Sequence, residues 1–282
     1  MTKHSDVGAG MSKPAAELSE DRKFVTALAR GLEILRCFTA GDTLLGNRDF
    51  VSRTGLPKAT VSRLTYTLAE LGYLRYDPAL SKYALDAGVL ALGGPLLTGS
   101  DLVDLARPHM RALATEIGAA VSIGCREGLE MIYLETIRSE TALTLGLTPG
   151  SRLSMLTSSM GRAYLASQAQ TERSALLNAL QLQVQLKAKV NEPGAAASSV
   201  ALMAAARAEI AAYPAQGCCY SFRDWHEDVN AAAVPFLDSV QRRWLVLSCS
   251  GPASSMDEGF FRQVVGPKLR ALAARLGAQP GV

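Results

Sequence analysis

The chain has neither a long apolar run nor an export signal. No apolar run reaches the roughly 20 residues that a membrane-spanning helix needs. The N-terminal stretch "MTKHSDVGAGMSKPAAELSE" lacks the apolar segment of a secretory signal. Because this stretch is polar and contains glycine and serine, we expect residues 1–20 to form a disordered tail. These absences disfavour membrane and secreted proteins, and we expect a soluble protein of the cytoplasm without a membrane partner.

Cysteine and histidine are also scarce. The chain has five cysteines, none at C-x-x-C spacing, and an odd number without an export signal indicates reduced thiols rather than disulfides. The three histidines are far apart in sequence, so no zinc site is expected. The motifs G-x-S-x-G, S-x-x-K, H-E-x-x-H and the P-loop do not occur. We therefore expect no metal, no cofactor and no catalytic residues.

The composition is that of a globular protein with more than one domain. The 282 residues include 48% apolar and 20% charged residues, which is enough to form substantial cores. The net charge of +3 is unevenly placed: residues 21–90 hold ten Lys/Arg and seven Asp/Glu, so the remainder sums to zero. The small positive excess therefore lies in the first third of the chain.

That basic region has the pattern of three helices followed by a hairpin. Apolar residues spaced three and four apart predict a helix over 24–41, and a short helix follows over 46–55 with Asn47 as a candidate N-cap. The third helix begins near Pro57 and ends at Gly72. Its apolar face consists of Val61, Leu64, Leu68 and Leu71. The segments "YLRYD" and "SKYAL" flank the turn "DPAL" and predict a hairpin.

Two helices joined by a short turn that contains glycine are typical of a helix-turn-helix, whose second helix enters the major groove of DNA. The polar face of the third helix carries hydrogen-bond donors and no acid before Glu70, and its N-terminus offers free N–H groups to phosphate. Basic residues of the hairpin suit a wing along the DNA backbone. The candidate DNA-binding residues are Arg53, Lys58, Ala59, Thr60, Ser62, Arg63, Tyr66, Arg75 and Lys82. The alternative is a three-helix core that happens to precede a hairpin.

The distal part of the chain changes from helical to strand periodicity at about residue 120. A helix over 102–119, broken or kinked at Pro108, has an apolar stripe that could serve in dimerisation. Strands follow in "AAVSIGC", "EMIYLETI" and "ALTLGLT", then helices, two further strands over 231–238 and 243–251, and a closing helix. This order predicts the α+β class, an antiparallel sheet flanked by helices. The expected domains are 21–90 for DNA binding, 91–119 as linker and dimerisation helix, and 120–282.

Three segments resemble the IclR family of bacterial transcription regulators. They are "GLPKATVSRLTYTLAELGYLRYDPALSKYALDAGVLALG", "TPGSRLSMLTSSMGRAYLAS", and "GCCYSFRDWHEDVNAAAVPFLD" followed by "LVLSCSGP". They lie in the order and at the spacing that the family shows, over residues 23–275. The resemblance implies an N-terminal winged helix-turn-helix and a GAF-like C-terminal domain that binds a small organic effector, usually a carboxylate. It further implies a homodimer or dimer of dimers on double-stranded operator DNA.

The effector site is expected where a helix begins beside a strand with two serines. The N-terminus of a helix near Ser159 favours an anion, and Ser248 and Ser250, two apart on a strand, point to the same face. The resemblance adds residues that match the family's ligand contacts. The full candidate set is Leu145, Leu153, Ser158, Ser159, Met160, Ser221, Val229, Ala231, Ser248 and Ser250. Some relatives have an acid in place of Ser221 and a cysteine in place of Ala231, which makes this site less charged.

Several alternatives stay open at this point. Ser158 and Ser159 could simply cap a helix, and Ser248 and Ser250 could hydrogen-bond within the sheet. Trp225, in a loop beside the expected pocket, could stack on an aromatic ligand or only pack. At the level of the whole protein, we expect a sequence-specific regulator, repressor or activator, whose DNA binding responds to the effector. The alternatives are an enzyme acting on a small metabolite with an appended helix-turn-helix, and a DNA-binding protein without a ligand.

Overall fold

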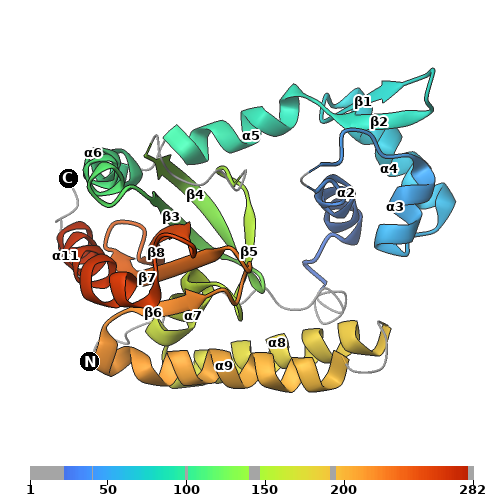
Figure 1. Ribbon diagram of the computed structural model, residues 1–282. Coiled ribbons are helices and arrows are strands. Elements are labelled where there is room, and N and C mark those ends of the chain that lie inside the picture. Colours follow the sequence, from blue (N-terminus) through green and yellow to red (C-terminus); the bar gives the residue numbers. More distant parts are fainter. Residues whose placement is uncertain (1–21, 40, 99–100, 140–146, 191–194, 279–282) are drawn as a thin grey trace, which may run out of the picture. The chain divides into compact units, whose positions relative to one another are not determined.

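The computed structural model describes residues 22–39, 41–98, 101–139, 147–190 and 195–278 (Figure 1). The chain divides into two compact units, one formed by residues 10–99 and the other dominated by residues 100–282. Each unit is described by itself. The expected disordered tail, residues 1–20, lies outside the described residues.

The N-terminal unit is a three-helix core followed by a two-stranded hairpin and a further helix. The elements are α2 (Thr26–Arg36), α3 (Asn47–Thr54), α4 (Lys58–Glu70), β1 (Leu74–Asp77), β2 (Lys82–Leu85) and α5 (Ala87–Thr98). Ile34, Phe50, Val61 and Leu74 are almost fully buried at its centre. The predicted order of helix, helix, turn, helix and hairpin is confirmed.

Two details of the helices differ from the predictions. Asn47 is the first residue of α3 rather than its N-cap; Gly46 is the cap, and its N–H donates to the Asp49 carboxylate at 2.8 Å. Leu71 is 62% exposed, because α4 ends at Glu70 and Leu71 is already the C-cap. Thr65 lies on the buried face of α4 instead, and its hydroxyl donates to the Val61 carbonyl at 3.0 Å.

The C-terminal unit is built on one six-stranded antiparallel sheet. Its strands are β3 (Ala120–Glu127), β4 (Glu130–Arg138), β5 (Arg152–Ser154), β6 (Cys219–Phe222), β7 (Val229–Asp238) and β8 (Arg243–Pro252), in the spatial order β5-β4-β3-β8-β7-β6. The helices are α6 (Asp101–Ile117), α7 (Ser159–Ser167), α8 (Gln170–Val190), α9 (Ala195–Gln216), α10 (Glu258–Phe260), a π-helical turn (Phe261–Val265) and α11 (Gly266–Gly277). The α+β class predicted from the sequence is confirmed.

Helices cover both faces of this sheet (Figure 1). Because side chains alternate along a strand, β3 sends Val121 and Ile123 into a core shared with α6 and α11. From the other face of the sheet, Met131 and Tyr133 of β4 join a second core shared with α7, α8 and α9. The small residues Ser122 and Gly124 lie on this second face, which is therefore the face able to hold a cavity.

The helix expected over 102–119 differs from its prediction. Helix α6 runs without a break through Pro108, which is exposed. Its apolar stripe, including Met110, Leu113 and Ile117, is buried in the core against the sheet of the same chain. The stripe that suggested a dimerisation helix thus serves packing within the chain.

The strands also differ in part from the sequence interpretation. Most of the predicted strand "ALTLGLT" lies outside the described residues, and the short β5 is the strand that pairs with the outer side of β4. Strand β6 was not predicted, although it forms one edge of the sheet. At that edge the Tyr220 N–H donates to the Glu209 carboxylate at 2.9 Å, and the Tyr220 carbonyl accepts from Arg162 at 2.9 Å. Side chains therefore satisfy both backbone groups of Tyr220 at this edge, which opposes pairing with another chain there.

Within the described part of the chain, no helix is both long enough and apolar enough to span a lipid bilayer.

Candidate functional site

The outer face of α4 presents the donors that the sequence predicted. Lys58, Ala59, Ser62, Arg63 and Tyr66 are exposed, and Thr60 is half-buried. In the described ranges, neither Lys58 nor Arg63 is ion-paired. Glu70, at the end of the helix, is its only acid. This face can therefore offer unpaired cations and hydroxyl groups to an anionic partner.

Arg53 is committed to its own unit. Its guanidinium donates to the Asp42 carboxylate and to the Cys37 carbonyl, each at 2.6 Å. Hydrogen bonds from Arg53 and then from Thr39 hold the pKa of Asp42 well below its usual range. Arg53 thus ties the end of α3 to the segment between α2 and α3, which gives it a structural role besides the predicted contact with DNA.

A basic hollow lies beside α4. It is lined by residues at the N-termini of α3 and α4 and by the hairpin, namely Gly46, Asn47, Arg48, Asp49, Lys58, Tyr76, Leu80, Ser81, Lys82 and Tyr83. Lys58 and Lys82 were predicted, and Arg48 was missed. Backbone pairing of Leu45 with Tyr83 holds the start of α3 against the hairpin. This pairing brings Arg48 to the hollow, and no local sequence signal indicates that position.

We expect the Arg63→Ala substitution to weaken binding to the specific DNA site by about 1–3 kcal/mol and to relax preference at one base pair, because an arginine that reads a guanine edge is worth that much. Competition gel shifts on single-base variants of the site measure both effects. Arg111→Ala, an exposed change on α6, is the control and should leave binding unchanged. An equal loss on all DNA sequences would contradict base reading and leave Arg63 as a phosphate contact.

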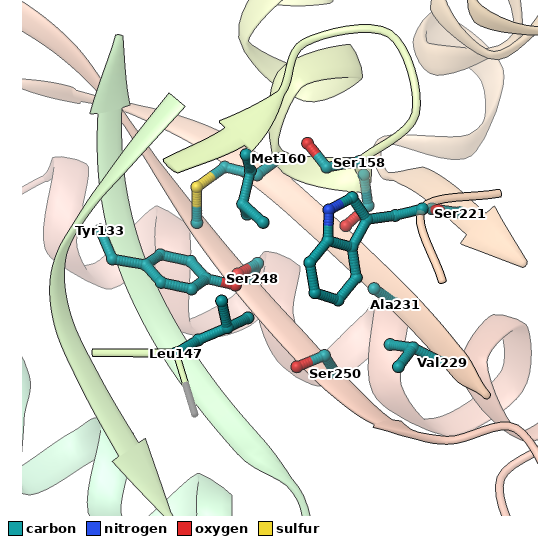
Figure 2. Close-up of a pocket in the computed structure, with 12 residues that line it drawn as sticks. Tyr133, Leu147, Ser158, Met160, Ser221, Val229, Ala231, Ser248 and Ser250 are labelled. Carbon is teal, nitrogen blue, oxygen red and sulfur yellow. The ribbon is translucent and has the colours of Figure 1, made fainter. Parts of the chain in front are cut away.

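A pocket opens on the second face of the C-terminal sheet (Figure 2). Its walls come from β4, β5, β6, β7, β8 and the start of α7, elements that are far apart in the sequence. The lining residues are Tyr133, Leu147, Leu153, Ser158, Ser159, Met160, Ser221, Trp225, Val229, Ala231, Ser248 and Ser250. All the predicted effector residues are among them except Leu145, which lies outside the described residues.

The start of α7 supplies hydrogen-bond donors to this pocket. Ser158 is the N-cap, since its hydroxyl oxygen accepts from the Gly161 N–H at 3.0 Å and the hydroxyl donates to the Ser154 carbonyl at 2.6 Å. Within the described residues, the hydroxyl of Ser159 and the N–H groups of Ser159 and Met160 have no hydrogen-bond partner. Ser158 therefore serves the helix, while Ser159 remains available to a ligand with oxygen acceptors.

A β-bulge brings Tyr133 into the pocket. The register between β3 and β4 shifts at Ile123 and Gly124, so Tyr133 rather than Leu134 is the partner of Gly124. Burial raises the pKa of Tyr133 to about 12, although hydrogen bonds with Ser122 and Ser248 act in the opposite direction. Tyr133 is thus a neutral phenol beside Ser248 (Figure 2). A Cβ atom on Gly124 would lie 2.8 Å from the backbone carbonyl oxygen of Ile132 and 2.5 Å from the sulfur of Met160, and the backbone contact favours glycine here.

The loop after β6 closes one side of the pocket with Trp225. The hydroxyl of Ser221 donates to the Thr157 carbonyl at 2.7 Å, which joins β6 to the turn before α7. Trp225 lines the pocket, whereas His226 is exposed. The sequence left open whether Trp225 stacks on a ligand or only packs. Its position in the pocket wall is compatible with stacking on a ligand.

Arg162 holds that loop from within the core. It is almost fully buried, and its guanidinium donates to the carbonyls of Leu156 at 2.8 Å and Tyr220 at 2.9 Å and to the Asp224 carboxylate at 2.6 Å. The second terminal nitrogen, Nη2, has no hydrogen-bond partner. Arg162 thus joins the start of α7, the edge strand and the residue before Trp225, and it positions the pocket walls rather than lining the pocket.

We expect Arg162→Met to lower the free energy of unfolding of the C-terminal unit by about 3 kcal/mol, because two buried carbonyls lose their donor while Asp224 can still be hydrated. Chemical denaturation followed by circular dichroism measures the loss. Arg111→Met removes an exposed arginine from α6 and should change stability by less than about 0.5 kcal/mol. Equal stabilities of the two variants would show that the buried hydrogen bonds of Arg162 contribute little.

The pocket is nearly closed. Its cavity volume is about 20 Å³, whereas one water molecule needs roughly 10–15 Å³. A larger ligand can enter only if lining side chains change rotamer, which is common on binding. Two large lining side chains can make room in this way. They are Trp225, in the loop after β6, and Met160, at the start of α7.

No group of three His, Cys, Asp or Glu side chains that could hold a metal ion occurs among the residues that the structure describes. The pocket contains hydroxyls, helix N–H groups and apolar side chains, and its described lining residues include no acid and no histidine. It can bind a small molecule with oxygen acceptors and an apolar body. The sequence did not indicate Tyr133 or Leu147, since the bulge that places Tyr133 depends on strand pairing.

Comparisons with known proteins agree with this geometry. Residues 95–278 match the family model described as "Bacterial transcriptional regulator IclR C-terminal", and residues 27–78 match the "IclR helix-turn-helix domain". The chain is 34% identical to the HTH-type transcriptional regulator TsaQ1/TsaQ2 of Comamonas testosteroni, over 90% of this chain and 88% of that protein.

Two solved structures have the same fold. An IclR family transcriptional regulator from Brucella abortus is similar with a TM-score of 0.83 and 38% identity, covering 93% of this chain and 95% of the other. An IclR homolog from Microbacterium hydrocarbonoxydans, complexed with 4-hydroxybenzoate, has a TM-score of 0.64 at 22% identity, covering 89% and 97%. The second similarity bears on the fold alone.

Proposed function

Because the chain belongs to the IclR family of bacterial transcriptional regulators and carries its helix-turn-helix domain, we propose that its DNA binding responds to a small organic carboxylate. The chain is a regulator rather than an enzyme. The observation that carries the proposal is the pocket, which gathers buried serines at the start of α7 and on β6 and β8 around one apolar space. The cytoplasm is the proposed site of action.

A carboxylate suits the polar end of this pocket. The N–H groups of Ser159 and Met160 lie at the positive end of the dipole of α7, where a negative charge is stabilised. Leu153, Met160 and Val229 supply an apolar surface for the rest of the ligand.

The proposed DNA-binding form is a homodimer, since two recognition helices must meet half-sites about one turn of DNA apart. The N-terminal unit carries exposed apolar side chains that are suited to contacts between two copies of the chain. Val25, Leu28 and Leu32 follow each other along one face of α2 and are 62%, 64% and 45% exposed, and Leu90 on α5 is 75% exposed. Covering such side chains in a second copy would remove apolar surface from water.

The test is a gel-shift titration of the purified protein on DNA that flanks its own gene, with and without a panel of aromatic and aliphatic carboxylates. We expect a specific shift whose midpoint changes with at least one compound, and which weakens as salt rises because counterions are released. A folded dimer that gives no specific shift at low salt would contradict the DNA-binding half. A specific shift that no small molecule changes would favour regulation without an effector.

A further inference from the structure

A second small cavity continues from the pocket towards β4. Its volume is about 10 Å³, and it is lined by Ala120, Ser122, Tyr133, Thr136, Arg138, Leu147 and Ser250. Tyr133, Leu147 and Ser250 line both cavities. Because the two cavities share these lining side chains, they lie next to each other, and a ligand that displaces the shared side chains would reach both.

The register of the sheet explains how the two cavities form one trough. Residues directly opposite on neighbouring strands point to the same face, and one such row crosses five strands. The row runs Arg138, Ala120, Ser250, Ala231 and Ser221, on β4, β3, β8, β7 and β6. Its three middle members are small, and neighbouring strands are roughly 4.8 Å apart. The small side chains therefore leave open space above the middle of the row, with Arg138 at one end and Ser221, beside the start of α7, at the other.

A second hydroxyl row runs alongside the first. Thr136, Ser122 and Ser248 are opposite one another on β4, β3 and β8. The hydroxyls of Ser122 and Thr136 are 3.0 Å apart. These hydroxyls give the trough polar partners along its length, whereas Leu147, Leu153 and Val229 form apolar walls.

Both ends of the trough attract negative charge. One end is the N-terminus of α7 with the unpartnered hydroxyl of Ser159. The other is the guanidinium of Arg138, which donates to the Leu147 carbonyl and has further N–H groups to offer. Within the described residues, no carboxylate is ion-paired with Arg138, and neither cavity lining contains an acid. A cation with no paired acid at one end of an apolar cavity suits a second acidic group on the ligand.

We propose that the effector is a two-ended dianion, with one carboxylate at the start of α7 and a second acidic group at Arg138. This proposal rests on the proposed function, because it assigns the ligand class of the same site. A short chain or a single ring joins the two acidic groups and lies across Ala120, Ser250 and Ala231. Arg138 is thereby a specificity-determining residue that distinguishes diacids from monoacids.

The test compares diacids with matched monoacids by isothermal titration calorimetry. The probes are pimelate, 1,4-phenylenediacetate and the monomethyl ester of each, which keeps the shape and removes one charge. We expect at least one diacid to bind the wild-type protein about tenfold or more tightly than its ester, as a charge-assisted hydrogen bond contributes that much. Arg138→Gln should remove this difference while leaving the affinity for the ester unchanged, and Arg138→Lys should retain part of it.

Arg152→Gln is the matched control, since Arg152 lies on the neighbouring strand β5, pairs with Glu127 and Glu130, and lines neither cavity. It should bind like the wild type. Equal affinities for diacid and ester, or an equal loss of both in Arg138→Gln, would overturn the proposal. A wild-type protein that binds none of the four probes would also overturn it. The operator gel shift with the wider panel then decides separately whether the proposed function stands.

Discussion

Replacing Ala231 with phenylalanine is expected to abolish the effector response and leave DNA binding intact. Ala231 lies on β7 between Ser250 and Ser221 in the row of small residues that floors the trough. With a cavity of about 20 Å³, the pocket has no room for a benzyl group unless Trp225 or Met160 is displaced. The added ring would occupy the space that a ligand needs, and we expect affinity for the effector to fall by about 100-fold or more, close to 3 kcal/mol.

The measurement for Ala231→Phe is the operator gel shift with and without an active compound, together with calorimetric titration of that compound. Ala231→Ser is the matched control, because a hydroxyl in place of a hydrogen leaves the trough open, and it should keep the response. Operator affinity in the absence of ligand should be the same for the three proteins. If Ala231→Phe still responds at wild-type ligand concentrations, the effector binds elsewhere.

Replacing Gly161 with alanine is expected to destabilise the C-terminal unit by about 3 kcal/mol, at the upper end of what overpacking usually costs. A Cβ atom on Gly161 would lie 2.2 Å from the Cα atom and 2.5 Å from the carbonyl oxygen of Met155. Both contacts are with backbone, so no side-chain rotation can relieve them, and the start of α7 must move away from the turn before it. That movement also displaces Ser159 and Met160 from the pocket.

Chemical denaturation of Gly161→Ala checks this expectation, with Gly277→Ala as the matched control. Gly277 ends α11 in the same unit, and a Cβ atom there meets its nearest neighbour at an ordinary 3.7 Å. We expect the control to change the free energy of unfolding by less than about 0.5 kcal/mol. A Gly161→Ala protein as stable as the control would show that the Met155 turn adapts easily, and the rigid helix N-terminus assumed for anion binding would lose its support.

The parts of the fold that follow local rules could be predicted from the sequence. Glycine and proline positions delimited α3 and α4, and the turn "DPAL" indicated the hairpin. Strand alternation placed Ser248 and Ser250 on one face, and the structure finds both in the pocket. The remaining pocket residues were found because three separated segments resemble one family, since periodicity alone does not show that β6 and β7 meet α7.

The features that depend on distant partners could not be predicted. Arg53 is an exposed candidate in the sequence, but its ion pair with Asp42 depends on how α3 packs. The burial of Arg162 depends on distant partners too, because charged side chains are mostly exposed and only the fold shows this one between the carbonyls of Leu156 and Tyr220. Likewise, the stripe on α6 gave no sign whether a second copy or the chain's own sheet would cover it.

The most direct test of the claim that effector and operator binding are coupled measures the affinity for each in the absence and presence of the other. Operator affinity is determined with and without a saturating active compound, and the affinity for that compound is determined with and without operator DNA. If DNA binding responds to the effector, thermodynamic linkage requires the two ratios to be equal, and we expect a factor of about 5 to 150. At the concentration that saturates the wild-type protein, the compound should leave the operator affinity of Ala231→Phe close to its ligand-free value. A compound that binds the pocket tightly and leaves operator affinity unchanged would contradict the account.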